Sequence, residues 1–316
     1  MTSFASVIIP TLNGAKRIGP TLEALVSQCI DKKLFEVIII DNNSTHDKYR
    51  VTEKHAGVCA LRDAAIECRV VTEPRTGLSY ARIKGILEAR SEFVCFLDDD
   101  NVPEADYISN GISLFTDPSV GVLVSRVYPR YECDPKKSMR RREHLFAINH
   151  RLGDSVIEWG SDTEFAPTIG AGMWVRRSAF LRAVPYTEPE RLLADRKGKS
   201  LTSGGDIELG YLIGKAGYKR VYSPKLRLLH LIPQSRLTSK YFCKLIVGII
   251  RSQKTIEVRY SQTNFGLRHR LISLLELLAA AALSPILMLR RDGLREVLFI
   301  LASRWARFEG PYKTLT

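Results

Sequence analysis

The stretch Phe93–Asn101 reads FVCFLDDDN, a short apolar run that ends directly in three adjacent aspartates. The apolar part, Phe93–Leu97, has the character of a buried strand. Three more runs of this kind precede it, at Ser6–Pro10, Glu36–Ile40 and Arg69–Thr72. Helical patterns separate the runs, at about residues 18–28, 48–66 and 78–89. This alternation predicts a parallel, Rossmann-like sheet that is covered on both faces.

Polar side chains follow three of the four predicted strands. They lie in residues 10–13 (PTLN), 41–44 (DNNS) and 98–101 (DDDN). Ligands of parallel sheets bind at the carboxyl ends of the strands. We therefore expect the chemistry of the chain at this edge.

The aspartate triplet predicts a cation site. Three adjacent carboxylates repel one another unless a cation or basic side chains offset their charge. Hard oxygen ligands select Mg²⁺ or Mn²⁺, and such an ion usually shares its coordination with substrate phosphates. The alternative is a solvated acidic turn before a helix that starts near Pro103.

Composition limits the class of protein. The 316 residues are 45% hydrophobic and 26% charged, which fits one large globular domain or two small ones and excludes a disordered chain or a polytopic membrane protein. None of the six cysteines forms a C-x-x-C pair, which favours a reducing compartment over a disulfide framework. The first residues, MTSFASVIIP, lack the pattern of a signal peptide.

Positive charge is concentrated in the last third of the chain. Residues 219–316 hold 18 Lys and Arg against 5 Asp and Glu and so carry the whole net charge of +13. Such a segment suits an anionic partner, either a lipid surface or a nucleic acid. No zinc-finger, RNP or helix-turn-helix signature supports a nucleic acid, so we expect none as a partner.

An apolar run of 19 residues, Leu271–Leu289, lies in this basic segment, with Arg268–Arg270 and Arg290–Arg291 on its flanks. It predicts a helix on a membrane surface, a spanning helix or a helix packed on the rest of the protein. Glu276 is costly inside lipid, and cations beside apolar surface bind anionic leaflets, so the surface helix has the best support.

Elements of the second half are less regular. The patterns predict a basic helical stretch at Lys136–Arg151, a turn into a strand at Ala166–Val175 and a polar loop at Tyr186–Gly205. A helix is predicted at Asp206–Ala216, and short strands are predicted at Tyr218–Tyr222 and Leu226–His230. From about Lys240 onwards the chain is predicted to be helical.

Six motifs in order are similar to those of the family 2 glycosyltransferases with a GT-A fold. They are VIIPTLNG (7–14), IIIDNNST (38–45), GLSYARIKGI (77–86), FLDDDN (96–101), GAGMWVRRSAF (170–180) and GGDIELGYLIGKAGY (204–218). The resemblance implies an α/β, GT-A Rossmann-like, mostly parallel sheet flanked by helices, with a basic helical extension. It divides the chain into a nucleotide-sugar-binding half (1–105), an acceptor-binding half with the catalytic base (106–238) and a helical tail (239–316).

The resemblance assigns nucleotide contacts to Pro10, Thr11, Asn13, Asp41, Arg82 and Asp98. It implies that Asp41 reads the base, usually uracil, that Arg82 faces the nucleotide and that Asp98 lies near the ribose. Ile83 departs from the Asn usual after this Arg. Pro10 and Asn13 also suit an ordinary turn.

Metal and catalytic positions follow from the same resemblance. Asp100 is the expected direct ligand of Mn²⁺ or Mg²⁺, and His230 lies beside the metal or diphosphate, or is structural. Asp206 matches the catalytic base, although Gly205 replaces the acid that usually precedes it, and Asp206 also suits a helix N-cap. Glu208 is the reserve candidate for the base, or a structural residue.

Sugar contacts are expected around Gly170, Ala171 and Gly172, where small residues let a substrate approach the backbone. Trp174 either stacks on a sugar or is a buried strand residue. Tyr186–Gly205 resembles a lid over the bound donor, or is an ordinary surface loop.

Together these features imply a metal-dependent, inverting transferase that moves sugar from a nucleotide-diphosphate sugar, with UDP favoured, to a hydroxyl of a glycan or lipid-linked acceptor. Bacterial surface polysaccharide synthesis is the expected setting, and the cytoplasmic side of the cell membrane the expected location. The alternatives are a sugar nucleotidyltransferase and a non-enzymatic basic protein that binds membrane or nucleic acid.

Overall fold

The computed structural model describes residues 5–161, 163, 165–193, 195–196, 201–261, 265–288 and 292–311. Leu289 and Arg290–Arg291 of the predicted tail helix and its flank lie outside these residues, as do residues 194 and 197–200 of the predicted lid.

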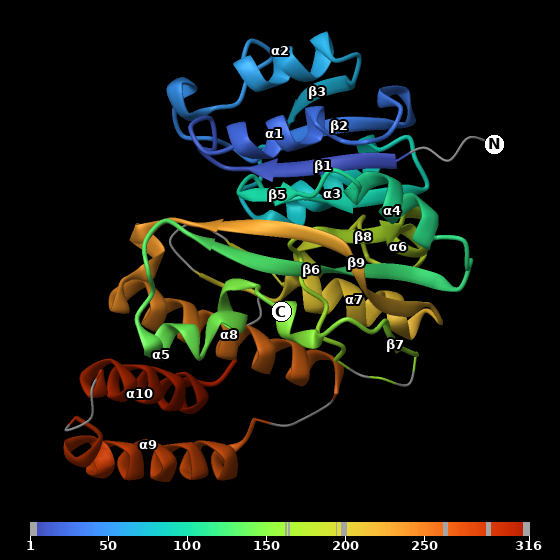
Figure 1. The fold of residues 1–316 in the computed structure, drawn as a ribbon. Helices are drawn as coiled ribbons and strands as arrows, with labels where there is room; N and C mark the ends of the chain where they lie inside the picture. Colours follow the sequence, from blue (N-terminus) through green and yellow to red (C-terminus); the bar gives the residue numbers. More distant parts are fainter. Residues whose placement is uncertain are drawn as a thin grey trace. The chain divides into compact units, whose positions relative to one another are not determined.

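Strands and helices alternate through the first part of the chain (Figure 1). The strands are β1 Ala5–Thr11, β2 Phe35–Asp41, β3 Glu67–Thr72, β4 Phe93–Phe96, β5 Asn101–Pro103, β6 Val120–Tyr131, β7 Ile157–Trp159, β8 Met173–Arg176 and β9 Lys219–Ile232. The α-helices are α1 Gly19–Val26, α2 Ala56–Asp63, α3 Leu78–Glu88, α4 Tyr107–Leu114, α5 Lys137–Arg140, α6 Arg177–Ala183, α7 Gly205–Lys215, α8 Ser239–Tyr260, α9 Leu267–Met288 and α10 Gly293–Glu309. The 3-10 turns are η1 Lys32–Leu34, η2 Asp47–Tyr49, η3 Glu143–Phe146, η4 His150–Leu152, η5 Pro189–Arg191 and η6 Gln234–Leu237.

The sheet has the order β3-β2-β1-β4-β8-β6-β9-β5, with β7 paired to β9. The first four of these strands pair in parallel, and β8, β5 and β7 pair antiparallel to their neighbours β4 and β9. The predicted α/β fold with its four N-terminal strands is confirmed. The sheet is mixed rather than wholly parallel, because the second half of the chain adds antiparallel strands.

Strand β9 corrects one expectation. The sequence predicts two strands separated by Ser223-Pro224-Lys225, but the structure has one strand of 14 residues. Strand β7 pairs with residues 220–222 and β5 with residues 228–230. Pro224 lies between these two partners, where the missing N–H breaks no hydrogen bond to either of them.

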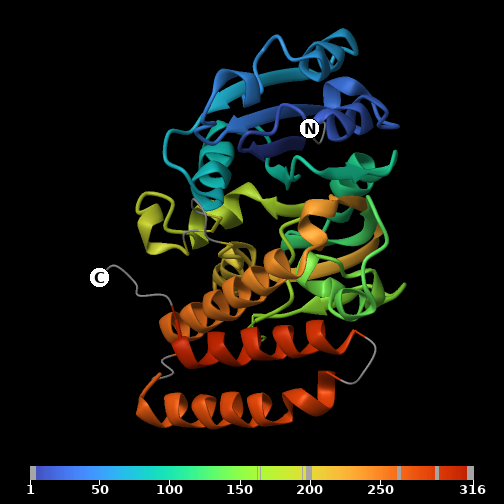
Figure 2. The same ribbon diagram turned by 90° about the vertical axis from the view of Figure 1, so that its left-hand side faces the viewer.

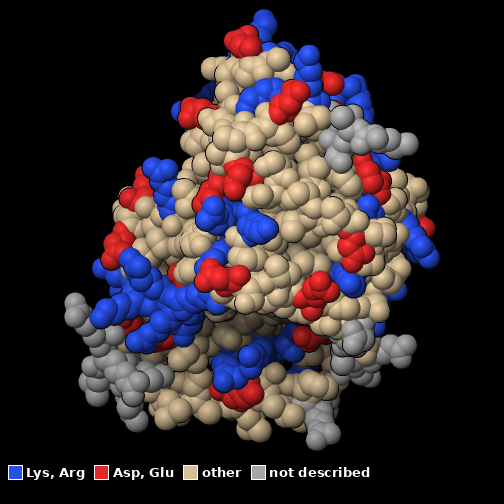
Figure 3. Space-filling model, turned by 45° about the vertical axis from the view of Figure 1, so that its right-hand side comes forward, with Lys and Arg blue, Asp and Glu red and all other residues tan. Residues whose placement is uncertain are grey.

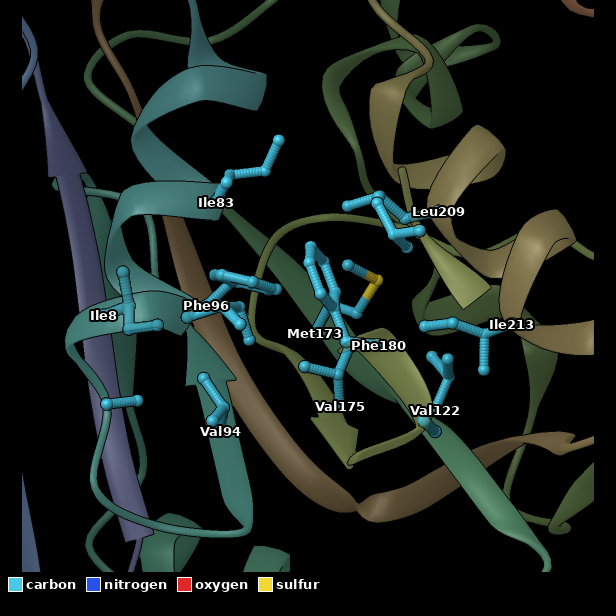
Figure 4. Packing of buried hydrophobic residues seen from close by; sticks show 14 of the residues in the cluster. Ile8, Ile83, Val94, Phe96, Val122, Met173, Val175, Phe180, Leu209 and Ile213 are labelled. Carbon is cyan, nitrogen blue, oxygen red and sulfur yellow. The ribbon is translucent and has the colours of Figure 1, made fainter. Parts of the chain in front are cut away.

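A buried core joins the parallel and antiparallel parts of the sheet. Side chains from β1, β4, β6 and β8 meet those of α3, α6 and α7 (Figure 4). Ile8, Val94, Phe96, Val122 and Ile213 are all fully buried. The same cluster packs α3, α6 and α7 against these strands.

Contacts divide the chain into two compact units. The first comprises Met1–Arg130, Ala147–Leu192 and Gly205–Leu231, and the second Tyr131–Phe146, Leu193–Gly204 and Ile232–Thr316. In the second unit, α10 packs against both α8 and α9 (Figure 2). Within the described residues, no helix combines the length and hydropathy needed to cross a membrane.

Candidate active site

The loops after β1 and β2 are tied together at the carboxyl edge of the sheet. The Asn13 amide donates to Ser44 Oγ at 2.9 Å, and the Thr45 amide donates to Asn13 Oδ1 at 2.9 Å. Asn13 has a φ of 55°, a left-handed conformation that Asn adopts more readily than most residues. The predicted nucleotide loop is thus an ordered turn beside Asp41.

Asp41 is fully buried at the end of β2. Its Oδ1 accepts a short hydrogen bond from Ser44 Oγ, and its Oδ2 lies 3.2 Å from Arg50 Nε. This Oδ2 has no hydrogen-bond partner among the described residues. Ser44 and Arg50 therefore hold the Asp41 carboxylate in place at the end of β2, with none of its side chain exposed.

Asp99, the middle acid of the triplet, is bound by the first loop. Arg17 donates from Nε and Nη2 to the two carboxylate oxygens at 2.7 and 2.5 Å, and Thr11 Oγ1 donates to Oδ2 at 2.6 Å. A Cβ on Gly14 would lie 2.4 Å from the same Oδ2, so this turn requires glycine.

Arg17 is a residue that the sequence analysis missed. Three adjacent acids require nearby basic groups, and this requirement could have pointed to Arg17. Arg17 follows Asn13 by four residues, in the loop that faces the aspartate triplet. The pairing spans 82 residues of sequence, so only the parallel arrangement of β1 and β4 brings the two together.

Asp100 and His230 meet through the pairing of β5 with β9. Asn101 is the register partner of His230, and the Leu231 amide donates to the Asp100 carbonyl at 2.8 Å. His230 Nε2 consequently lies 3.5 Å from Asp100 Oδ1, and both side chains are more than nine-tenths buried.

The donor set of this pair fits a divalent cation. A carboxylate oxygen and an imidazole nitrogen 3.5 Å apart can bind one Mn²⁺, whereas Mg²⁺ would take the carboxylate oxygen alone. Burial raises the pKa of Asp98, while the charges of Arg82 and His230 act in the opposite direction. Among the described residues no three His, Cys, Asp or Glu side chains form a metal cluster.

Arg82, Gly170 and Asp206 form the other half of the site. The Gly170 amide donates to Asp206 Oδ2 at 2.6 Å, and Thr168 Oγ1 donates to the Asp206 carbonyl at 3.0 Å. A Cβ on Gly170 would lie 2.3 Å from Arg82 Nη2 and 3.1 Å from Asp206 Oδ2. The absence of a side chain at Gly170 therefore lets a buried guanidinium approach the carboxylate at the start of α7.

The remaining predicted residues lie around this centre. Pro10 is in β1, paired with Ile40, and Ala171 and Gly172 follow Gly170 in a buried turn. Gly172 has a φ of 67°, and its carbonyl accepts from Tyr107 and Ser125 at 2.6 Å each. Glu208 is 1% exposed on α7.

Trp174 corrects an expectation. It is 0% exposed, and its ring packs against Tyr107, Phe115 and the backbone of Gly111. The side chain points into the core from a strand that is paired on both sides. Stacking of Trp174 on a sugar is therefore wrong for this structure, and the buried-strand interpretation holds.

Comparisons with known proteins identify the family of the chain. The family model described as Glycosyl transferase family 2 matches residues 6–182. Glycosyltransferase AglE of Haloferax volcanii is 24% identical over 249 residues, which are 72% of this chain and 80% of that protein.

Two solved structures share the fold. The mannosyltransferase PcManGT of Pyrobaculum calidifontis, in complex with GDP-Man and Mn²⁺, has a TM-score of 0.61 at 16% identity and matches 97% of this chain and 86% of its own. Residues 1–349 of TarS of Staphylococcus aureus, in complex with UDP, have a TM-score of 0.52 at 17% identity and match 96% and 90%. The family model matches more than half of the chain, so the chain belongs to glycosyl transferase family 2 and is a glycosyltransferase that uses a nucleotide-sugar donor.

Proposed function

We propose that the chain moves a sugar from a UDP-sugar to a hydroxyl of a glycan or lipid-linked acceptor, with inversion at the anomeric carbon. The reaction is assigned to surface polysaccharide synthesis at the cytoplasmic face of the cell membrane, where the protein is peripheral. The observation that carries the proposal is the meeting of Asp206, Arg82 and Gly170 next to the aspartate triplet.

Asp206 acts as the general base. The Gly170 amide and the Ile207 amide donate to its two carboxylate oxygens at 2.6 and 2.9 Å, which fixes the orientation of the carboxylate. A carboxylate oriented in this way accepts the proton of the attacking hydroxyl as the new bond forms. One in-line displacement then inverts the anomeric carbon.

Arg82 faces the charge that develops on the departing diphosphate. Its guanidinium is 2% exposed and lies near both Asp98 and Gly170, so its charge acts in a largely water-excluded site. Asp100 and His230 would hold Mn²⁺ or Mg²⁺. The ion, when bound, neutralises charge on the leaving diphosphate.

Donor recognition divides between the two ends of the site. Residues 1–105 bind the nucleotide, with Asp41 on the base, Asp98 near the ribose and Pro10, Thr11 and Asn13 in the adjoining loop. Residues 106–238 bind the acceptor and supply the base, with Gly170–Gly172 at the sugar. The place of Asp41 at the carboxyl end of β2, where the family resemblance puts the acid that reads the base, supports recognition of uracil.

Solved relatives support parts of this proposal. TarS was crystallised with UDP, and it is named as a poly(ribitol-phosphate) β-N-acetylglucosaminyltransferase. PcManGT was crystallised with a GDP-sugar and Mn²⁺. The choice of uracil for this chain therefore rests on Asp41 and its surroundings.

Release of nucleoside diphosphate from a panel of UDP- and GDP-sugars, with Mn²⁺ or with EDTA, tests the proposal. We expect metal-dependent release from a UDP-sugar and a loss of about 10²–10⁴-fold in kcat for Asp206→Asn with donor binding retained. Asp63→Asn, at an exposed aspartate of α2, is the matched control. Full activity of Asp206→Asn, or release only from GDP-sugars, would contradict the assignment of base or of donor.

A further inference from the structure

Helix α9 is an outer helix of the second unit, and it packs on α10 through one face (Figure 2). On that face Ser273 and Ala280 are buried. Glu276 forms a short ion pair with Arg304 of α10 and lies 3.6 Å from Arg307. The single acidic residue of the apolar run is therefore paired with α10, while its side chain stays 38% exposed.

The opposite face of α9 is apolar and exposed. Leu271, Leu275, Leu278 and Ala282 follow one another at intervals of four, three and four residues, which places them in one row along the helix. We call this row the α9 stripe. Its three leucines are 52%, 66% and 57% exposed, and Ile272 and Leu283 widen it at 48% and 55%.

We propose that the α9 stripe inserts into the boundary between headgroups and acyl chains of an anionic lipid bilayer. The inference extends the membrane part of the proposed function and does not depend on the transfer reaction. Exposed apolar rows of this length on a soluble surface are costly unless something covers them. A helix that lies in the plane of the membrane buries such a face by about 5–10 Å.

Cations lie at both ends of the stripe. Arg270 is exposed at the start of α9. At the other end, α10 begins five residues after α9 ends, and there Glu296 lies 3.6 Å from Arg141, which is 72% exposed. Figure 3 shows Lys and Arg side chains gathered at the lower left of the molecule. Cations beside an apolar row match anionic headgroups above acyl chains.

The charge also argues against a second copy as the occupant. Residues 219–316 carry the whole net charge of +13, so two stripes that faced each other would bring like charges together. Repulsion of this kind opposes self-association and leaves attraction to an anionic surface intact. The ion pair with Arg304 offsets the charge of Glu276, the one acid of the apolar run, on the side of α9 that faces α10.

Sedimentation of the full chain with vesicles tests the inference, using equal parts phosphatidylglycerol and phosphatidylcholine against phosphatidylcholine alone. The variant Leu275→Gln, Leu278→Gln keeps helix propensity almost unchanged. We expect strong binding to the anionic vesicles that weakens about tenfold for each leucine replaced. Leu87→Gln, at a residue 48% exposed on α3, is the matched control and should bind as the parent does.

Three results would overturn the inference: no binding of the parent to anionic vesicles, equal binding by the double variant, or a stable dimer that the double variant dissociates. Release of nucleoside diphosphate in vesicle-free solution is measured on the same samples. Vesicle binding without turnover would refute the transfer reaction and leave the stripe, whereas turnover without vesicle binding would refute the stripe alone.

Discussion

At the residue scale, the three adjacent aspartates have separate surroundings. Asp99 is bound by Arg17 and Thr11, whereas Asp100 lies beside His230. Burial raises the pKa of Asp99, and the hydrogen bonds and charge of Arg17 oppose that rise. The middle acid thus connects two loops, from β1 and from β4.

Replacing Arg17 tests this connection. Arg17→Gln leaves the buried carboxylate of Asp99 without its cation. We expect a loss of about 1–2 kcal/mol in the free energy of unfolding. This is less than the usual cost of breaking a fully buried pair, because the Arg17 side chain is 39% exposed. The proposed function places the first loop on the nucleotide, so the Michaelis constant for the donor should also rise. Arg17→Lys keeps the positive charge but cannot donate two hydrogen bonds from one planar group. It should recover part of the lost stability and part of the donor affinity. Urea unfolding and steady-state kinetics measure the two effects, and an unchanged KM would separate Arg17 from donor binding.

At the element scale, the helices approach the sheet through glycines. Gly111 of α4 faces Trp174 of β8, and Gly85 of α3 faces Ile8 of β1. A Cβ on Gly111 would lie 2.2 Å from the Trp174 ring and one on Gly85 2.3 Å from Ile8 Cγ2. The tight approach explains how a fully buried Trp fits between a helix and the sheet.

Gly111→Ala separates the helix propensity of α4 from its packing against Trp174. Ala favours a helix over Gly by about 1 kcal/mol, but the ring of Trp174 cannot move aside cheaply. We expect a net loss of about 1–3 kcal/mol in the free energy of unfolding. Gly19→Ala, where a Cβ meets nothing within 4 Å, is the control and should be neutral or stabilising. A stabilised Gly111→Ala protein would show that the helix can shift away from the sheet.

The turn between β3 and α3 makes stability depend on pH. Burial raises the pKa of Glu73, but hydrogen bonds and charge from Arg75 outweigh it, so the pKa lies below its ordinary value. A lowered folded-state pKa stabilises the protein fully above the ordinary Glu value of about 4.3, and the contribution disappears as the pH falls through the folded pKa. The urea midpoint of the parent should therefore exceed that of Glu73→Gln at pH 7 and approach it in acid. Glu23→Gln, at an exposed residue of α1, is the control, and its urea midpoint should match that of the parent both at pH 7 and in acid.

The sequence predicted those elements whose signal is local. β1, β2 and β4 are continuous apolar runs that are almost wholly buried, and this pattern needs no knowledge of partners. β3 is the edge strand, and only Cys68 in it is buried. β6 and the full length of β9 mix buried and exposed residues, so they depend on neighbours added later in the chain. The residues after the strands were predicted for the same local reason. The contact of Arg17 with Asp99 and the burial of Trp174 depend on tertiary packing, which a single sequence does not display.

At the scale of the whole molecule, ligand binding should stabilise the fold through the site. UDP and Mn²⁺ bound together add about 2.7 kcal/mol when the free ligand is 100 times its dissociation constant. We expect the melting temperature to rise more with both ligands than with either alone, and EDTA to reverse the difference. Asp100→Ala should lose the metal-dependent part, measured by differential scanning fluorimetry. An equal rise with UDP alone would show that the nucleotide binds without metal.

The pairing of Asn101 with His230 limits how this protein can be altered by evolution or in the laboratory. Backbone hydrogen bonds, rather than packing of the imidazole, decide which residue of β9 faces Asp100. Deleting or inserting one residue between the start of β9 and His230 would shift the strand by one position. Leu229 or Leu231 would then occupy the position beside Asp100, and the imidazole would point to the opposite face of the sheet. Substitution libraries across β9 should therefore retain many active members. Libraries of single-residue insertions and deletions in the same strand should retain almost none.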